Sequence, residues 1–126
     1  MSKPLSLEQK AFNAVVKHAR KQNTKAKNDL GFCCYRAKDG KRCFIGCILP
    51  DRLYKKELEK KRFDVILKKF GDSILSSWKY RSLDQNFGNQ LQNIHDNTKL
   101  YNWECEFRNF AKVYSLKYTP PVVAAS

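Results

Sequence analysis

The most informative segment of the sequence runs from Phe32 to Tyr54 and reads FCCYRAKDGKRCFIGCILPDRLY. It contains four of the five cysteines, and its Asp39-Gly40 pair separates two short runs of aromatic and small apolar residues. Asp-Gly is a strong tight-turn signal, because glycine readily adopts the positive φ that hairpin turns require. The pattern therefore predicts an antiparallel β-hairpin with strands over 32–36 and 42–45.

The sequence leaves the register of this hairpin open. A four-residue loop places Cys34 opposite Cys43, whereas a two-residue loop places Arg36 opposite Cys43. The apolar pair Ile48-Leu49 is compatible with a third short strand.

The rest of the chain predicts about four helices. The first has Ser6 as its N-cap and ends near Gln22, because an apolar stripe at helical spacing follows a capping-box pattern. The second covers 52–70 with a break near Arg62. The third follows a capping box at Ser82 and reaches about residue 96, and the last is capped by Asn102.

The predicted fold class is therefore α+β, with a short antiparallel β-hairpin packed against about four α-helices. We expect a single compact domain over 1–118 and a flexible C-terminal tail over 119–126. The N-terminal segment lacks the apolar core of a signal peptide, and no apolar run approaches the ~20 residues needed to span a membrane. The expected location is the cytoplasm.

Positive charge is concentrated in the first part of the chain. The net charge is +13; residues 1–70 hold 19 Lys and Arg against 7 Asp and Glu, whereas residues 71–126 hold 6 against 5. This exceeds the ~2–8 charges typical of a small soluble domain. The asymmetry predicts an anionic partner on one side of the molecule, and its alternative is a lysine-rich solvated surface.

Several motifs resemble a family of small proteins found in bacteriophages and in prophage regions of bacterial genomes. They are Cys34-Tyr35-Arg36, Asp39 to Cys43, Ile45 to Asp51 with Tyr54, Leu91 to Asp96, and Trp103-Glu104. The resemblance covers the chain from about Phe12 to Leu116. It implies a phage context inside a bacterial host, but no biochemical function and no catalytic residue.

The cysteines allow three interpretations. Free cysteine packs like a small hydrophobe, so burial in the core is the plainest. A structural zinc ion is the second, since zinc takes tetrahedral sets of Cys and His; the candidate ligands are Cys34, Cys43, Cys47 and His95. The spacing lacks the usual Cys-x2-Cys knuckle, which weakens the zinc signal.

The third interpretation is a cysteine-dependent hydrolase that uses Cys47 as nucleophile and His95 as base. A catalytic thiol needs a base within hydrogen-bond reach and a third group that orients the base. Asp96 is a poor candidate for that third group, because neighbouring residues on a helix point about 100° apart.

Arginines and aromatic residues around the predicted hairpin suggest a ligand site without catalysis. Arginine binds phosphate in a bidentate manner and aromatic rings stack on bases. The candidate ligand-binding residues are Lys17, Arg20, Lys21, Tyr35, Arg36, Lys41, Arg42, Arg52 and Tyr54. They would hold the ligand between the hairpin and the first helix.

The sequence thus predicts a small basic binding protein that engages a nucleotide-like ligand, such as a host-defence signal, or nucleic acid. A nucleotide in a pocket raises the melting temperature by mass action, whereas nucleic-acid binding weakens steeply with salt. A further alternative is an inhibitor of a host protein that handles nucleic acid.

Overall fold

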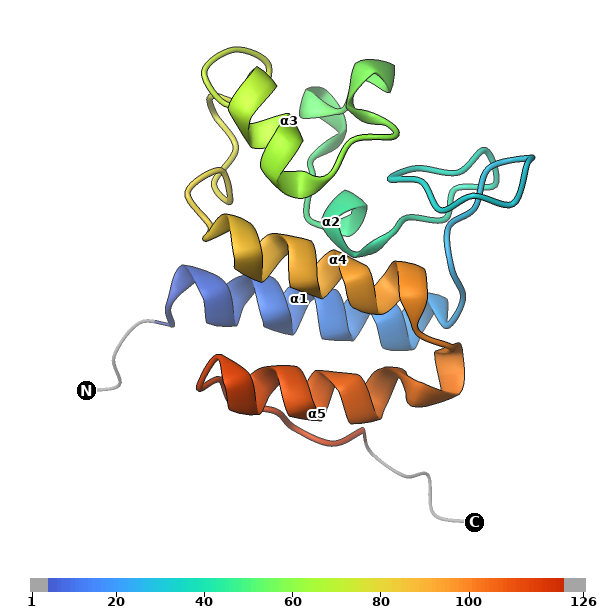
Figure 1. Ribbon diagram of the computed structural model, residues 1–126, viewed down its shortest axis with the longest axis vertical. Helices are drawn as coiled ribbons and strands as arrows, with labels where there is room; N and C mark the ends of the chain where they lie inside the picture. Colours follow the sequence, from blue (N-terminus) through green and yellow to red (C-terminus); the bar gives the residue numbers. More distant parts are fainter. Residues whose placement is uncertain (1–4, 122–126) are drawn as a thin grey trace.

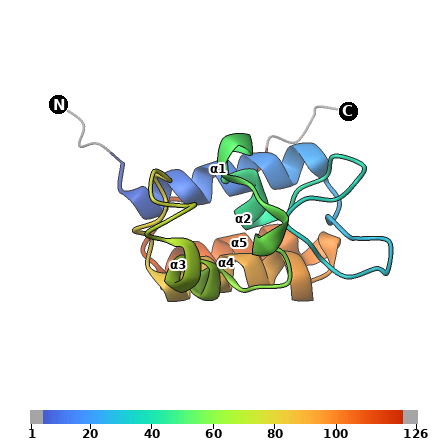
Figure 2. The same ribbon diagram turned by 90° about the horizontal axis from the view of Figure 1, so that it is seen from above.

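The computed structural model describes residues 5–121 and is almost entirely helical (Figure 1). Its α-helices are α1 (Leu7–Gln22), α2 (Phe44–Cys47), α3 (Phe63–Phe70), α4 (Gln85–Asn97) and α5 (Trp103–Val113). Three 3-10 turns, η1 (Asp51–Leu53), η2 (Lys56–Leu58) and η3 (Leu100–Asn102), connect them. The helices α1, α4 and α5 lie side by side, and α5 runs against the direction of the other two (Figures 1 and 2).

The predicted α+β class is wrong, because the described residues contain no sheet. Two isolated antiparallel bridges, Lys27 with Cys33 and Arg36 with Arg42, are the only β pairing in them. The second bridge matches neither of the two predicted registers. The tight turn itself forms: Gly40 has φ 88°, and its backbone N–H donates to the Ala37 carbonyl over 3.1 Å.

Competing partners for the backbone explain why the hairpin does not extend. The amides of Tyr35 and Arg36 donate to the Glu59 carboxylate over 2.8 and 3.1 Å instead of to a strand. On the other side, Cys43 begins α2, and its Sγ accepts from the Gly46 amide over 3.2 Å. Half of the predicted second strand, Phe44 and Ile45, is therefore helix, and Ile48 follows α2 instead of forming a third strand.

Gly46 allows α2 to press directly against the loop at Tyr35. A Cβ on Gly46 would lie 2.1 Å from the Tyr35 carbonyl oxygen, closer than any side chain tolerates. Glycine at this position therefore permits a close helix-to-loop contact.

The helix boundaries were predicted with mixed success. Ser6 caps α1 by accepting from the Gln9 amide over 3.1 Å, as expected. Within the segment 52–70, the α-helix begins only at Phe63, and Arg62 occupies the N-cap position of α3. The break in the predicted helix therefore lies near Arg62, as expected. For α4 the cap is Asp84, not Ser82: the Asp84 carboxylate accepts from the Phe87 amide over 2.9 Å. Asn102 occupies the N-cap position of α5 but makes no side-chain cap bond.

Aromatic side chains from α1, α2, α4 and α5 form the core. The Phe44 ring of α2 lies 4.9 Å from Trp103 and 5.5 Å from Phe107, and Phe12 stacks on Phe110 at 5.7 Å. All five of these side chains are buried. Because α2 inserts its phenylalanine among the long helices, the loop that precedes α2 is held beside the core.

The segment after α5 is tied to α1. The Gln9 amide group donates to the Lys117 carbonyl over 3.1 Å and accepts from the Lys117 N–H over 2.8 Å. Arg20 donates to the Thr119 carbonyl over 2.8 Å. The described part of the predicted tail therefore starts as a bound segment, and residues 122–126 lie outside the described residues.

Candidate ligand-binding cleft

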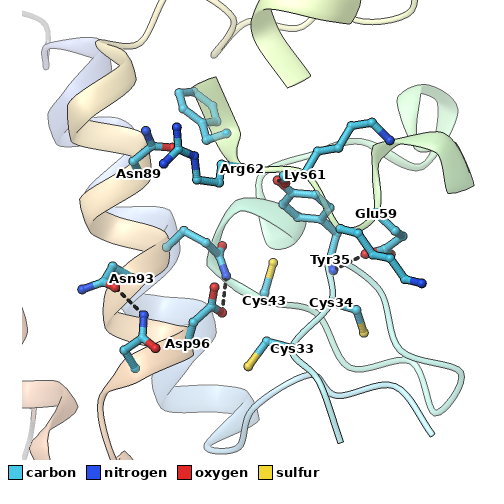
Figure 3. Close-up of a pocket in the computed structure, with 14 residues that line it drawn as sticks. Cys33, Cys34, Tyr35, Cys43, Glu59, Lys61, Arg62, Asn89, Asn93 and Asp96 are labelled. Carbon is cyan, nitrogen blue, oxygen red and sulfur yellow. Dashed lines mark hydrogen bonds between the residues drawn. The ribbon is translucent and has the colours of Figure 1, made fainter. Parts of the chain in front are cut away.

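A polar cleft of about 290 Å³ lies beside α4. Its other walls are the segment 59–63 and the loop at 33–35 (Figure 3). Arg62 and Asn89 face each other at one end of the cleft, and Cys33 and Asp96 lie at the other end. Helix α1 contributes no lining residue, so the cleft is not between the hairpin loop and the first helix, as the sequence suggested.

Carboxamide side chains line the α4 wall. Asn89, Asn93 and Asn97 recur every four residues and therefore share one face of the helix. Asn97 donates to the Asn93 side-chain oxygen. The Asn89 oxygen accepts from the Asp64 amide over 3.2 Å, which fixes the orientation of the group. Burial opposes ionisation of the Asp64 carboxyl, but a hydrogen bond from the Asn89 side chain, with Arg62 beside it, lowers its pKa. The Asn89 amide nitrogen therefore directs one hydrogen at Asp64 and keeps one for a ligand.

A chain of hydrogen bonds fixes the floor of the cleft. The Gln92 oxygen accepts from the Ile45 amide over 2.8 Å, and its nitrogen donates to Asp96 Oδ1 over 2.8 Å. His95 Nδ1 lies 2.8 Å from the same oxygen. The Ala26 amide donates to His95 Nε2 over 3.1 Å. Since a backbone N–H can only donate, the imidazole proton is assigned to Nδ1, which donates to Asp96.

The acidic residues of the cleft are engaged within the protein. Glu59 accepts three hydrogen bonds, two from the amides of Tyr35 and Arg36 and one from the Tyr54 hydroxyl over 2.6 Å. Asp96 Oδ1 accepts hydrogen bonds from Gln92 and His95, as described above. The cationic run Lys60-Lys61-Arg62 lines the cleft beside these carboxylates, and Arg62 pairs with Asp64 over 3.0 Å.

Lys60 holds an unusual backbone conformation at this position. Its φ is 64°, in the left-handed region that residues with a Cβ rarely occupy. Its exposed side chain lines the cleft, and its ammonium group has no ion pair among the described residues. The backbone strain of about 1 kcal/mol or more is therefore kept at the rim of the cleft.

The thiols near the cleft are not activated for nucleophilic chemistry. Burial raises the pKa of the Cys33 thiol, and the Asp96 charge adds to this effect. Burial, with the Glu59 charge second, raises the pKa of Cys34 to about 11. Burial also raises the pKa of Cys43 well above its usual range and that of Cys47 to about 12. Nucleophilic cysteines have lowered pKa values, so these residues suit packing.

The geometry does not support the predicted hydrolase pair. Cys47 donates its thiol to the Phe44 carbonyl over 3.0 Å, and His95 is fully buried with both ring nitrogens occupied by Ala26 and Asp96. The sequence argument against Asp96 as a partner of His95 was wrong, because Asp96 does bond to the His95 ring. While Nδ1 is bonded to Asp96, His95 Nε2 accepts a hydrogen bond from the Ala26 amide and not from a thiol.

The predicted zinc ligands do not form a cluster. In the described chain one group of three potential ligands converges, Cys33, His95 and Asp96, with their ligand atoms within 4.8 Å of one another. Of the predicted set Cys34, Cys43, Cys47 and His95, only His95 belongs to it. A metal at His95 Nδ1 would turn the ring to its other tautomer and point Nε2–H at the Ala26 N–H. The observed tautomer is therefore set for hydrogen bonding and not for zinc.

Most of the predicted arginine ligands are engaged in internal contacts. Arg36 pairs with Asp51 over 2.6 Å, donates to the Leu49 carbonyl over 2.6 Å and lies 4.8 Å from the Tyr54 ring centre. Arg42 shares Asp51, at 2.9 Å. Arg52 donates to Ser77 over 2.8 Å, and Arg20 pairs with Glu104 at the same distance.

The other predicted ligand residues are scattered. Lys17 and Lys21 are exposed on α1, and Lys41 pairs with Asp39 over 3.2 Å on the turn. Tyr35 is buried, and its hydroxyl donates to the Lys61 carbonyl. Tyr35 lines the cleft described here, whereas Arg36 and Tyr54 line a neighbouring one.

The residues that sequence reasoning missed are the basic run 60–62 and the asparagines of α4. Both had a signal: three consecutive cations, and carboxamides at spacing four opposite the apolar stripe of Phe87, Leu91 and Ile94. The signal was weak because polar side chains on the outer face of an amphipathic helix usually face only solvent.

No family model, no curated protein and no solved structure matches this chain. Among the described residues, no helix is both long enough and apolar enough to cross a membrane.

Proposed function

We propose that this protein binds a small nucleotide-like anion in the α4 cleft and does so without catalysis. The observation that carries the proposal is the pairing of two kinds of group around one cleft. Cations lie at the rim, where Lys60 has no ion pair among the described residues and Arg62 pairs with Asp64 over 3.0 Å. A hydrogen-bond donor with fixed orientation lies on the α4 wall at Asn89.

The chemistry of the walls suits a phosphate joined to a nucleobase. Guanidinium and ammonium groups bind phosphate oxygens, and asparagine or glutamine side chains pair with the edges of bases. Because Glu59 and Asp96 already accept internal hydrogen bonds, they repel an anion less than free carboxylates would. The volume of about 290 Å³ lies at the lower end of the ~300–1,000 Å³ usual for ligand sites, which favours a ligand of mononucleotide size.

The motif resemblance and the charge support, as part of the same proposal, a setting in a bacterial cytoplasm during phage infection. A phage protein of this kind would sequester a nucleotide used as a signal by host defence. Sequestration requires tight binding and no turnover, in keeping with the raised pKa values of the thiols near the cleft.

The test is a binding titration of the full chain with the four common nucleoside monophosphates and with the matching nucleosides, followed by thermal melting and calorimetry. We expect at least one nucleotide to raise the melting temperature by mass action, with the nucleoside weaker. The cleft variant is Lys60→Asn with Arg62→Gln, because asparagine tolerates the left-handed backbone of residue 60. It should weaken nucleotide binding by about tenfold or more.

The matched control is Lys17→Gln with Lys21→Gln, which removes the same two charges from the exposed face of α1. It should bind nucleotide as the unmodified chain does. Equal losses in both double variants would mean diffuse attraction to charge and would overturn the cleft proposal. So would a preference for single-stranded oligonucleotide with a log–log salt slope near −0.7 for each phosphate contacted.

A further inference from the structure

The loop before the hairpin turn presents two large apolar side chains to solvent. Leu30 is 80% exposed and Phe32 is 67% exposed. In the ribbon the segment 24–43 projects from the helical body beyond the C-terminal end of α1 (Figures 1 and 2). Adjacent exposed apolar residues of this size are a usual mark of an interaction surface.

The backbone of this loop is fixed by hydrogen bonds. The Asn28 side-chain oxygen accepts from the amides of Leu30 and Phe32, each over 3.0 Å, and the Asn28 amide donates to the Phe32 carbonyl over 2.8 Å. Gly31 supplies the positive φ of 84° that the turn requires. The backbone that carries the two apolar side chains is therefore held in place before any partner arrives, which reduces the entropy lost on binding.

Leu30 and Phe32 form one side of a second cleft, of about 700 Å³. Ala37 and Tyr54 add apolar surface to it. This cleft adjoins the α4 cleft, and the two share Cys33, Cys34, Glu59 and Lys60 as a common wall.

The charged groups around the second cleft are mainly cationic. Lys38 pairs with Asp29 over 2.8 Å, and Arg36 pairs with Asp51. The Glu59 carboxylate accepts three internal hydrogen bonds. Lys56 and Lys60 are exposed and have no ion pair within residues 5–121. An apolar groove with unpaired lysines on its rim is complementary to a ligand that is apolar at its centre and acidic at its ends.

We propose that this second cleft docks an acidic segment of a partner protein, one large apolar side chain of which packs against Leu30 and Phe32. The flanking carboxylates of that segment pair with Lys56 and Lys60. The two proposals share Lys60, but the docking proposal does not rest on nucleotide binding, since Leu30 and Phe32 do not line the α4 cleft.

Single-stranded nucleic acid fits the same groove less well. Such strands are bound on successive open aromatic faces. Here the Tyr54 ring already lies 4.8 Å under the Arg36 guanidinium, and its hydroxyl bonds to Glu59. Phe32 is then the one exposed ring among the lining residues, and the aliphatic Leu30 beside it offers no stacking surface.

The experiment selects short random peptides from a display library on the full chain and removes those that also bind a Leu30→Ser/Phe32→Ser variant. Because both positions are exposed, this variant should fold, which circular dichroism checks. We expect the selected peptides to carry an acidic excess around one large apolar residue. By fluorescence anisotropy, a selected peptide should lose about tenfold or more in affinity for the loop variant. It should keep its affinity for a Tyr101→Ser/Val113→Ser control, which alters side chains that are 77% and 76% exposed elsewhere.

Three outcomes would overturn the docking proposal. The first is that no peptide distinguishes the full chain from the loop variant. The second is that the selected peptides lack an acidic excess. In the third, an oligodeoxythymidylate binds more tightly than any selected peptide and depends on Phe32, which would assign the groove to nucleic acid. Nucleotide binding by the α4 cleft should be the same in the loop variant, so failure of one proposal is separable from failure of the other.

Discussion

At the scale of single residues, the role of a polar side chain depends on the groups to which it is hydrogen-bonded in the folded protein. His95 looks like a candidate base or metal ligand in the sequence, yet it is fully buried, with its two nitrogens facing the Ala26 amide and the Asp96 carboxylate. The centre of its ring also lies 5.1 Å from the Phe44 ring centre and 5.9 Å from the Trp103 ring centre. The residue therefore joins the loop before the hairpin turn to the core.

Replacement of His95 by leucine should destabilise the protein by about 3 kcal/mol. The Ala26 amide would be left buried without an acceptor, and Asp96 would lose a donor, each at a cost of ~1–3 kcal/mol. Urea unfolding followed by circular dichroism measures the loss. The control His18→Gln keeps a donor for the Arg42 carbonyl, 2.8 Å from His18 Nε2, and should cost about 1 kcal/mol or less. Equal effects would mean that the His95 bonds contribute little.

The cysteines should alkylate slowly, with one exception. At neutral pH the raised pKa values of Cys33, Cys34, Cys43 and Cys47 keep these thiols protonated, and only thiolate reacts with iodoacetamide. Cys105 is exposed on α5 and should react first. Mass spectrometry of timed samples, with denatured protein as the control, gives the order. If Cys47 reacts faster than Cys105, the result would contradict this prediction and support the hydrolase alternative.

At the scale of elements, the packing of α3 on α4 depends on one glycine. A Cβ on Gly88 would lie 2.2 Å from the Phe63 ring, and both residues are buried. The ring of Phe63 in turn lies 5.9 Å from Trp78, whose indole N–H donates to the Ile48 carbonyl over 2.8 Å. The approach of α3 therefore positions the neighbouring segment 59–62, which carries the cations of the cleft.

Gly88→Ala should destabilise the protein although alanine favours helix by about 1 kcal/mol over glycine. The extra methyl group has no room against the buried Phe63 ring, and overpacking typically costs ~1–3 kcal/mol. Thermal unfolding should show a lower midpoint than that of the unmodified chain. A double variant with Phe63→Leu should recover part of the loss, because the smaller side chain vacates the ring position. A higher midpoint for Gly88→Ala alone would contradict the close packing.

Element prediction from the sequence succeeded where one local pattern acts alone. The Ser6 cap, the stripe of α1 and the stripes of α4 and α5 all follow from spacing within one segment. The hairpin failed because its strand amides found a partner outside the segment, the Glu59 carboxylate, which local patterns do not reveal. The carboxamide face of α4 was missed for the same reason, since only the fold brings the 59–63 segment beside it.

At the scale of the whole molecule, an ion pair and a hydroxyl tie the C-terminal segment to the bundle. Arg20 on α1 and Glu104 on α5 are 2.8 Å apart, and the Tyr118 hydroxyl donates to Glu104 over 2.7 Å. The Arg20 hydrogen bond, first among several contacts, holds the pKa of Glu104 below its usual range. A carboxylate that is easier to ionise in the folded chain stabilises the fold at every pH at which it is charged.

The Glu104 carboxylate should make the stability of the folded protein depend on pH in the acidic range. Above the ordinary Glu pKa of about 4.3 the contribution is complete, and it is lost as the pH falls through the lowered folded value, because the unfolded chain takes up the proton first. Unfolding midpoints measured between about pH 6 and pH 3 should fall less steeply for Glu104→Gln than for the unmodified chain. Since the pair is about one-third exposed, we expect an effect below about 1 kcal/mol.

The control for this measurement is Glu106→Gln, two residues along the same helix, which has no ion pair in the described part of the chain. It should follow the pH dependence of the unmodified protein. An identical slope for Glu104→Gln and the unmodified chain would contradict the role assigned to the Arg20–Glu104 pair.

The bonds between Gln9 and Lys117 also bear on how the chain matures during synthesis. A ribosome must deliver 108 further residues after Gln9 before this partner exists. The α5 rings that cover Phe12 of α1, Phe107 and Phe110, are likewise made only late in the chain. Between the synthesis of α1 and that of α5, a chaperone that recognises exposed aromatic residues can therefore bind the apolar side of α1.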